Sequence, residues 1–376
     1  MFGEKVLGNN RRPITQIKEA LIKNKGVIFI LLLAVLSLFV SYFYIGYTHQ
    51  LEKDAISYFE AANFLQGKAI DGPAPMNRIL TTPLFLYLAV FLNFFLKDFS
   101  LSVSVLNIVL YFLFTGAFYL LAREVYKKSE VAFWGSLLLV SNYYLIDPGN
   151  AHLADMGGWF FFVLTTYLAV RYINLSDRKF YYLTILVAAI GVLYKENGGL
   201  GLFSLFLLLL VSDFSWKQKI KDIILAGFLF LIPFLSYHLF VYFHYHYSYF
   251  DWYLFIKASS YNVGYQTKGA VSLIKILGWV FSLAWLTWLL GIKEELKEKN
   301  KNRLKILLAI LPASLFFFLW PVIAQRLAFI LVPWLCLIAG FGLSKIKPYW
   351  AGAFIIFYIL FNYNIKFLID IINLPF

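Results

Sequence analysis

A carboxylate opens a helical pattern in the first long segment between apolar runs, and it could take part in acid–base chemistry. Asp54 begins this pattern, and Gly67 is placed to end it. The residues on one face of the helix are Tyr58, Ala61 and Leu65. An aspartate at a helix start can serve as an N-cap. If it faces a cavity instead, it can act as a general base or bind a metal ion. The sequence leaves both interpretations open.

A second carboxylate, Asp155, opens a later apolar run after a short polar turn. The helix dipole favours an acid at this position, so Asp155 can also be a cap. His152 precedes it by three residues, about one helical turn. Two carboxylates and an imidazole can hold a divalent cation. Asp54, Asp155 and His152 are therefore candidate metal ligands, with Mg²⁺ or Mn²⁺ as the ion.

Three basic residues near the ends of apolar runs could bind a phosphate group. Lys195 lies beside Glu196 in a break between two runs, where the two side chains could also pair with each other. A lysine in a shallow cavity can bind phosphate as a point charge. Arg326 begins a later run, and a guanidinium group suits two-pronged phosphate contacts. Arg78 precedes the segment 81–84 and is the third candidate.

Aromatic residues crowd the segment 242–265, which also contains His244 and His246. Aromatic residues near a membrane surface usually form an interfacial belt, although they can also stack on sugars. The two histidines face apart on a helix, which favours the interfacial interpretation over a metal site. The candidates for contact with substrate are Tyr58, Glu196 and Tyr261.

The elements that must position these side chains are membrane spans. The chain of 376 residues is 61% apolar and only 14% charged, whereas a soluble domain carries about 25% charge. The charges also cluster in short segments between long uncharged runs, which is typical of spans joined by loops. We therefore expect an all-α, polytopic integral membrane protein.

Eleven apolar runs are suitable for spans. They are 27–47, 101–122, 131–146, 156–172, 180–194, 197–212, 223–243, 271–292, 306–321, 327–343 and 349–368. The run Pro83–Leu96 has only fourteen residues, which is short for a crossing.

The positive-inside rule decides whether this short run crosses. If it does not, the basic N-terminus shares one side with the basic loops near 123–128, 171–179, 217–221, 293–305 and 345–347. If it does cross, every later loop changes side and the asymmetry is lost. We therefore predict a juxtamembrane or re-entrant helix at 83–96, within an outer loop at 48–100. A second outer loop is predicted at 244–270.

This topology predicts three parts. They are a basic cytoplasmic leader at 1–26, a transmembrane catalytic domain at 27–345, and a C-terminal span with its tail at 346–376. The net charge of +13 could suggest nucleic acid as a partner. We exclude that class because the basic residues lie in short loops, where anionic lipid headgroups explain them. Cys336 is the single cysteine and is expected to be a small buried apolar residue.

Together these stretches resemble the GT-C glycosyltransferases. The resemblance is to the branch of the dolichyl-phosphate-mannose protein mannosyltransferases and the bacterial aminoarabinose transferases. The residues that carry it are Asp54 with Tyr58, Ala61, Leu65 and Gly67; Arg78 with Thr82-Pro83-Leu84; Asp155 with Trp159 to Phe162; Gly191 with Lys195 and Glu196; and Arg326, Pro333, Gly340 and Gly342. The sequence departs from the family in having Ala55 after Asp54 instead of a glutamate, and in lacking the large C-terminal soluble domain of several members.

The resemblance implies inverting transfer of a sugar from a polyprenyl-phosphate donor to a lipid, glycan or protein acceptor. It implies that Lys195, Arg326 and Arg78 bind the donor phosphate. Asp54 would be the catalytic base and Asp155 the second catalytic carboxylate. The active site would face outward from the plasma membrane of a prokaryote, or lie in the ER membrane of a eukaryote.

Two alternatives stay open. A lipid-linked glycan polymerase or ligase would share the donor pocket but use a preassembled chain. A transporter or lipid flippase would use the same carboxylates for ion coupling, and inverted repeats would favour it. The sequence shows no such repeat.

Overall fold

Every regular element among the described residues of the computed structural model is helical. The described residues are 25–44, 53–68, 74–143, 145–146, 151–262, 270–319 and 325–372. The predicted all-α class is confirmed for this part of the chain. Most of the predicted leader 1–26 lies outside the described residues, as do parts of both predicted outer loops.

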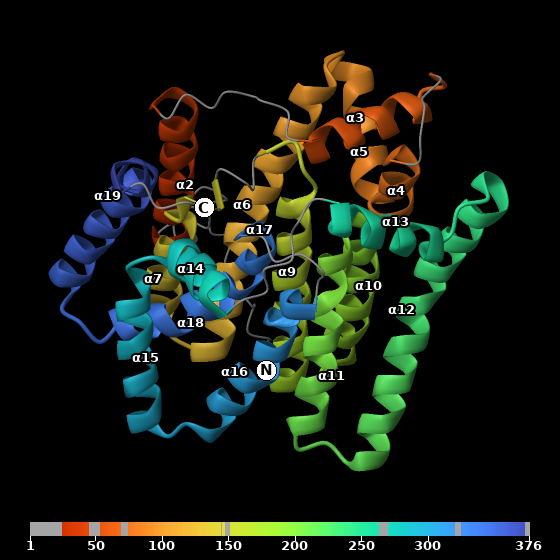
Figure 1. Ribbon diagram of the computed structural model, residues 1–376. Helices are drawn as coiled ribbons and strands as arrows, with labels where there is room; N and C mark the ends of the chain where they lie inside the picture. Colours follow the sequence, from red (N-terminus) through yellow and green to blue (C-terminus); the bar gives the residue numbers. More distant parts are fainter. Residues whose placement is uncertain are drawn as a thin grey trace, which may run out of the picture.

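Long helices packed side by side form the centre of the molecule (Figure 1). α6 (Phe99–Tyr126) packs along α9 (Asp155–Leu175), which packs in turn along α10 (Arg178–Tyr194). α6 also contacts α7 (Ser129–Val140), and α7 packs against α18 (Val332–Leu343). One continuous apolar core therefore joins both halves of the described chain.

The other helices surround this core. They are α2 (Lys25–Tyr44), α3 (Lys53–Leu65), α4 (Ala74–Thr81), α5 (Pro83–Leu96), η1 (Glu196–Leu200), α11 (Gly201–Val211), α12 (Trp216–Tyr245), α13 (Tyr249–Asn262), α14 (Ala270–Phe281), α15 (Ala284–Glu298), α16 (Lys301–Ser314), η2 (Phe316–Leu319), α17 (Gln325–Ala328), η3 (Phe329–Leu331) and α19 (Pro348–Ile372).

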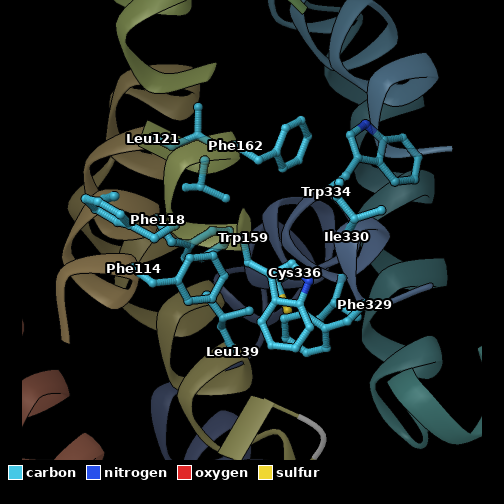
Figure 2. Packing of buried hydrophobic residues seen from close by; sticks show 14 of the residues in the cluster. Phe114, Phe118, Leu121, Leu139, Trp159, Phe162, Phe329, Ile330, Trp334 and Cys336 are labelled. Carbon is cyan, nitrogen blue, oxygen red and sulfur yellow. The ribbon is translucent and has the colours of Figure 1, made fainter. Parts of the chain in front are cut away.

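Large aromatic side chains fill the middle of the core (Figure 2). The ring of Trp159 in α9 lies 4.3 Å from the ring of Phe329, measured between centroids. Phe114 of α6 approaches the same phenylalanine at 6.5 Å. Cys336 lies beside them as a free thiol that is 1% exposed, which confirms its predicted role as a buried apolar residue.

Glycines let α18 approach two neighbours closely. A Cβ atom on Gly340 would lie 2.6 Å from the Cα of Gly135 in α7, and one on Gly342 would lie 2.2 Å from the carbonyl oxygen of Thr287 in α15. Small residues permit such close contacts between membrane helices. The Gly-x-Gly pair noted in the sequence is therefore explained by helix packing.

α12 stands at the edge of the bundle (Figure 1), and only 6% of its most apolar stretch is buried inside the protein. Asp222 near its start is fully buried and attaches it to the neighbouring helices. The Asp222 carboxylate accepts hydrogen bonds from Arg178 Nη1 at 2.7 Å and from the Tyr172 hydroxyl at 3.0 Å. The apolar exposed face of α12 is that of a helix in contact with lipid.

Among the described residues, five helical segments are long and apolar enough to cross a membrane, by length and composition. They are Phe99–Tyr126, Asp155–Leu175, Trp216–Tyr245, Lys301–Leu319 and Arg326–Leu343. Shorter apolar helices occupy Ile28–Phe39, Ser129–Val140 and Glu196–Val211. The protein is thus a multi-pass integral membrane protein, and the number of eleven crossings stays a prediction.

The short helix predicted at 83–96 is present as α5, with the same bounds. The preceding helix meets it at an angle of 107°, and the two together could form a broken span or a re-entrant loop. The separate helix is therefore confirmed, while its side of the membrane stays a prediction.

The apolar run 271–292 is not one continuous helix. The structure has α14 and α15 there, separated near Ser282, whose φ is 49°. The Trp285 indole N–H donates to the Leu277 carbonyl across this break, at 3.1 Å. Apolar residues continue through the break, so the sequence pattern gives no sign of it.

The loops predicted to share the cytoplasmic side meet at one end of the molecule. Lys128 Nζ lies 3.9 Å from the Glu298 carboxylate, and Lys345 Nζ lies 2.5 Å from it. Lys305 lies 3.5 Å from Asp213. The loops at 123–128, 293–305 and 345–347 therefore lie together, as predicted, and α3, α4 and α5 lie at the opposite end (Figure 1).

Candidate active site

α3 carries Asp54 in its first turn, as the helical pattern in the sequence predicts. The helix ends at Leu65, and Gly67 adopts a left-handed φ of 81°. Tyr58 is 1% exposed and Ala61 is 0% exposed, so this face of α3 is held against the bundle. The packing fixes where the Asp54 carboxylate is presented.

The Asp54 carboxylate lies between two arginines from distant parts of the chain. Arg78 of α4 donates from Nη2 to Oδ1 at 2.9 Å, and Arg326 of α17 donates from Nη2 to Oδ2. Both carboxylate oxygens thus accept from guanidinium groups, which a helix cap does not explain. Burial raises the pKa of Asp54, but Arg78 and Arg326 outweigh it and hold the pKa below its ordinary value of 3.8.

Arg78 is also oriented by α3. Its Nε donates to Ser57 Oγ at 2.7 Å, and its guanidinium lies 4.4 Å from the ring centroid of Tyr58. Ser57 was not predicted, although it follows Asp54 by three residues on the same helix. The side chains of Arg78 and Arg326 keep 23% and 28% exposure, so a ligand can reach both cations.

The second predicted carboxylate pairs with the predicted lysine. Asp155 opens α9 and is fully buried, and Lys195 Nζ lies 2.8 Å from its Oδ1. The distance makes an ion pair, but neither Asp155 oxygen has a hydrogen bond of good geometry within the described chain. The N-cap of α9 is Ala154, without a side-chain cap bond. Capping therefore does not account for Asp155 either.

A tight turn places Lys195 over Asp155. The turn joins α10 to η1, and a Cβ on Gly198 would lie 2.5 Å from the Gly191 carbonyl oxygen. Tyr194 packs equally closely on Gly157, where a Cβ would lie 2.0 Å from its ring. Side chains at these glycines would push the turn away from α9. Burial lowers the pKa of Lys195, but Asp155 outweighs it and holds that pKa above its ordinary value.

The two ion pairs belong to one cluster of charges. Asp155 and Asp54 both attract the charge of Arg326. Glu196, which is half-buried at the start of η1, attracts both Arg78 and Lys195. The charged members are Asp54, Asp155, Glu196, Arg78, Lys195 and Arg326, so the formal charges balance.

The remaining predicted residues have different surroundings. His152 Nε2 lies 2.6 Å from Ser100 Oγ. The part of the chain that the structure describes holds no group of three His, Cys, Asp or Glu side chains that could bind a metal. Asp54 and Asp155 face arginine and lysine in this arrangement, and a divalent cation at these residues stays a prediction. The Tyr261 side chain lies outside the described residues.

The chain matches the family model described as dolichyl-phosphate-mannose-protein mannosyltransferase over residues 81–240. No curated protein matches it by sequence. Asp54 and Arg326 lie outside the matched segment, whereas Asp155 and Lys195 lie within it.

Solved structures match most of the chain. ArnT from Cupriavidus metallidurans in the apo state has a TM-score of 0.64 and 15% identity, covering 88% of this chain and 62% of ArnT. The same protein bound to undecaprenyl phosphate has a TM-score of 0.63 and 16% identity, and the match covers 86% of this chain and 61% of ArnT. A third match is the oligosaccharyltransferase AglB from Archaeoglobus fulgidus, in complex with an inhibitory peptide and a dolichol-phosphate. It has a TM-score of 0.53 and 12% identity, and the match covers 90% of this chain and 54% of AglB.

The chain thus spans less than two thirds of the length of each of these proteins. At such identities the likeness establishes the fold, and the family model matches less than half of the chain. The predicted resemblance is confirmed at the level of the fold: the chain has the fold of ArnT and AglB, and its residues 81–240 match the family model of the protein mannosyltransferases.

Proposed function

We propose that the protein is a membrane glycosyltransferase that uses a polyprenyl-phosphate-linked sugar as donor. The observation that carries the proposal is the Asp54 carboxylate held between Arg78 and Arg326, two arginines that a ligand can reach. The solved ArnT bound to undecaprenyl phosphate and AglB in complex with a dolichol-phosphate support the choice of donor.

Arg78 and Arg326 bind the donor phosphate in this proposal. Guanidinium groups suit phosphate oxygens because they can donate two parallel hydrogen bonds. Without donor, Asp54 is the counter-ion of both arginines, so phosphate and Asp54 compete for the same N–H groups. Lys195 adds positive charge from the interior, where Asp155 balances it. The buried Asp155 holds Lys195 in place and attracts Arg326.

In the reaction, the bond between the sugar C1 atom and the phosphate oxygen breaks. The acceptor hydroxyl oxygen forms a new bond to C1 from the opposite face, which inverts the configuration. Asp54 accepts the hydroxyl proton as general base. The polyprenyl phosphate leaves with the negative charge, which Arg78 and Arg326 stabilise. Asp54 becomes a stronger base as its arginines turn toward the phosphate, because opposite charges no longer hold its pKa down.

The first experiment titrates undecaprenyl phosphate into purified variants. Arg78→Ala and Arg326→Ala should each weaken binding by about 1.5–3 kcal/mol, the value of a hydrogen bond to a charged group. Asp54→Asn should bind at least as tightly as wild type, because the competing charge is gone. Its rate of polyprenyl phosphate release from a polyprenyl-phosphate sugar should fall roughly a hundredfold or more.

Lys97→Ala is the matched control, because Lys97 is an exposed cation that lies over the Phe94 ring. It should bind undecaprenyl phosphate as wild type does. Unchanged binding by both arginine variants would remove the proposed donor site. Full turnover by a folded Asp54→Asn variant would remove the proposed base.

Transfer of a preassembled glycan is the second candidate, favoured by the likeness to AglB, an oligosaccharyltransferase. The donor phosphate and the residues that bind it would be the same. Mass spectrometry of the transferred group separates the two candidates. A gain of one sugar supports the first, and a gain of an oligosaccharide supports the second.

A further inference from the structure

Two tyrosines from outside α4 hold the residues on either side of Arg78. Tyr237 of α12 donates its hydroxyl hydrogen bond to the carbonyl oxygen of Ile79 at 2.7 Å. Tyr247, between α12 and α13, donates to Asn77 Oδ1. Asn77 is 6% exposed and Ile79 is 1% exposed, and both hydrogen bonds are partly buried.

The sequence explains why Ile79 needs an outside donor. In a continuous helix its carbonyl would accept from the residue four positions later, but that residue is Pro83, which has no N–H. A carbonyl left without a partner in an apolar environment is costly. The Tyr237 hydroxyl supplies the missing donor at the place where the chain bends by 107° between the two short helices.

α4 depends on such outside contacts for its position. It has only eight residues, and a helix this short has little stability of its own. α12, by contrast, is a helix of thirty residues that is attached at its far end through the buried Asp222. The Tyr237 bond therefore connects α4 to this helix, and the Tyr247 bond connects α4 to the segment that follows it.

We propose that Tyr237 and Tyr247 are positioning residues for Arg78. They fix α4 so that the guanidinium group points toward Asp54 and, if the proposed function is correct, toward the donor phosphate. Neither hydroxyl bonds to Asp54 or Arg78 in the structure, and their effect on the donor passes through Arg78.

The test is a double-mutant cycle with undecaprenyl phosphate as the probe. Tyr237→Phe and Tyr247→Phe keep the rings, and each should weaken binding about 3- to 10-fold, as expected for one neutral hydrogen bond. In an Arg78→Ala background the same substitutions should cause no further loss. Tyr242→Phe is the control, because Tyr242 lies on the same helix and is 51% exposed.

The outcomes are distinct. Binding at the wild-type level in both phenylalanine variants would overturn the inference while leaving the donor site intact. Equal losses with and without Arg78 would show a general structural role and would also overturn it. Normal binding by Arg78→Ala itself would instead show that Arg78 does not bind the donor phosphate. That result would contradict the proposed function, and the inference about the two tyrosines would also be wrong.

Discussion

At the level of single residues, two guanidinium groups set the charge state of the Asp54 carboxylate. Burial raises its pKa, and Arg78 and Arg326 lower it by more, so the carboxylate is ionised before donor binds. A phosphate that draws these arginines away brings its own negative charge. Both changes favour the protonated carboxyl and make Asp54 a better proton acceptor in the donor complex.

The pH dependence of turnover follows from this change. The acid limb of kcat/KM reports the free enzyme and should lie below pH 3.8, the ordinary pKa of an aspartate. The acid limb of kcat reports the donor complex and should lie about one unit or more higher. The pKa of Asp54 is lowered in the free enzyme. Its ionised form and its ion pairs therefore persist above that pKa and are lost as the pH falls through it.

Donor turnover at saturating and at low donor concentration, measured across the acid range, gives both limbs. Their separation supports competition between phosphate and Asp54 for the arginines. Coincident limbs would contradict it, since the pKa of the base would then be independent of the donor.

The sequence predicts the charged members of the site but not their partners. Charged residues near membrane depth are costly, so Asp54 at the start of a helical pattern and Asp155 at the start of an apolar run can be singled out. The contact between Asp54 and Arg326 joins residues 272 positions apart, and no local pattern contains it. Tyr237 and Tyr247 were missed because tyrosines near a membrane surface usually belong to the interfacial belt.

At the level of elements, a buried ion pair joins α15 to α16 at the end opposite the site. Arg303 Nε donates to Glu295 Oε2 at 2.8 Å, and each side chain is 5% exposed. The guanidinium lies 5.0 Å from the ring centroid of Tyr126 and 4.6 Å from that of Phe341. Arg303 also donates to Glu298, whose pKa is lowered to about 2, chiefly by its bond to Lys345.

Glu295→Gln should destabilise the protein by up to about 3 kcal/mol, because it leaves the Arg303 charge buried with one partner fewer. Thermal unfolding in detergent measures the change. Glu294→Gln is the control: it breaks only a surface pair with Lys297, worth about 1 kcal/mol or less. Binding of undecaprenyl phosphate should be normal in both variants. An unchanged melting temperature for Glu295→Gln would contradict the role of this pair.

Element bounds follow the sequence where a local signal marks them. Pro83 marks the start of α5, and Gly67 lies just beyond the end of α3. Ser282 lies inside a predominantly apolar run, so hydropathy alone cannot place the break there.

At the level of the whole molecule, the candidate site and the basic loops lie at opposite ends of the bundle (Figure 1). This separation agrees with the positive-inside partition, from which we predict that the site lies on the outer side.

Cysteine labelling in intact cells tests this orientation. Cys336 is 1% exposed, so the native thiol gives little background. A membrane-impermeant reagent should label Tyr253→Cys, on the exposed side of α13, and should not label Lys299→Cys, in the loop between α15 and α16. External labelling of Lys299→Cys would reverse the assignment.

The central claim is that Arg78 and Arg326 hold a polyprenyl phosphate at the Asp54 end of the bundle. Mass spectrometry of lipids that co-purify with the protein from its native membrane tests it most directly. We predict a polyprenyl phosphate, or its sugar-linked form, in wild type and in Asp54→Asn, with most of it lost in a folded Arg78→Ala, Arg326→Ala double variant. Absence of such a lipid from wild type, or equal amounts in the double variant, would contradict the account.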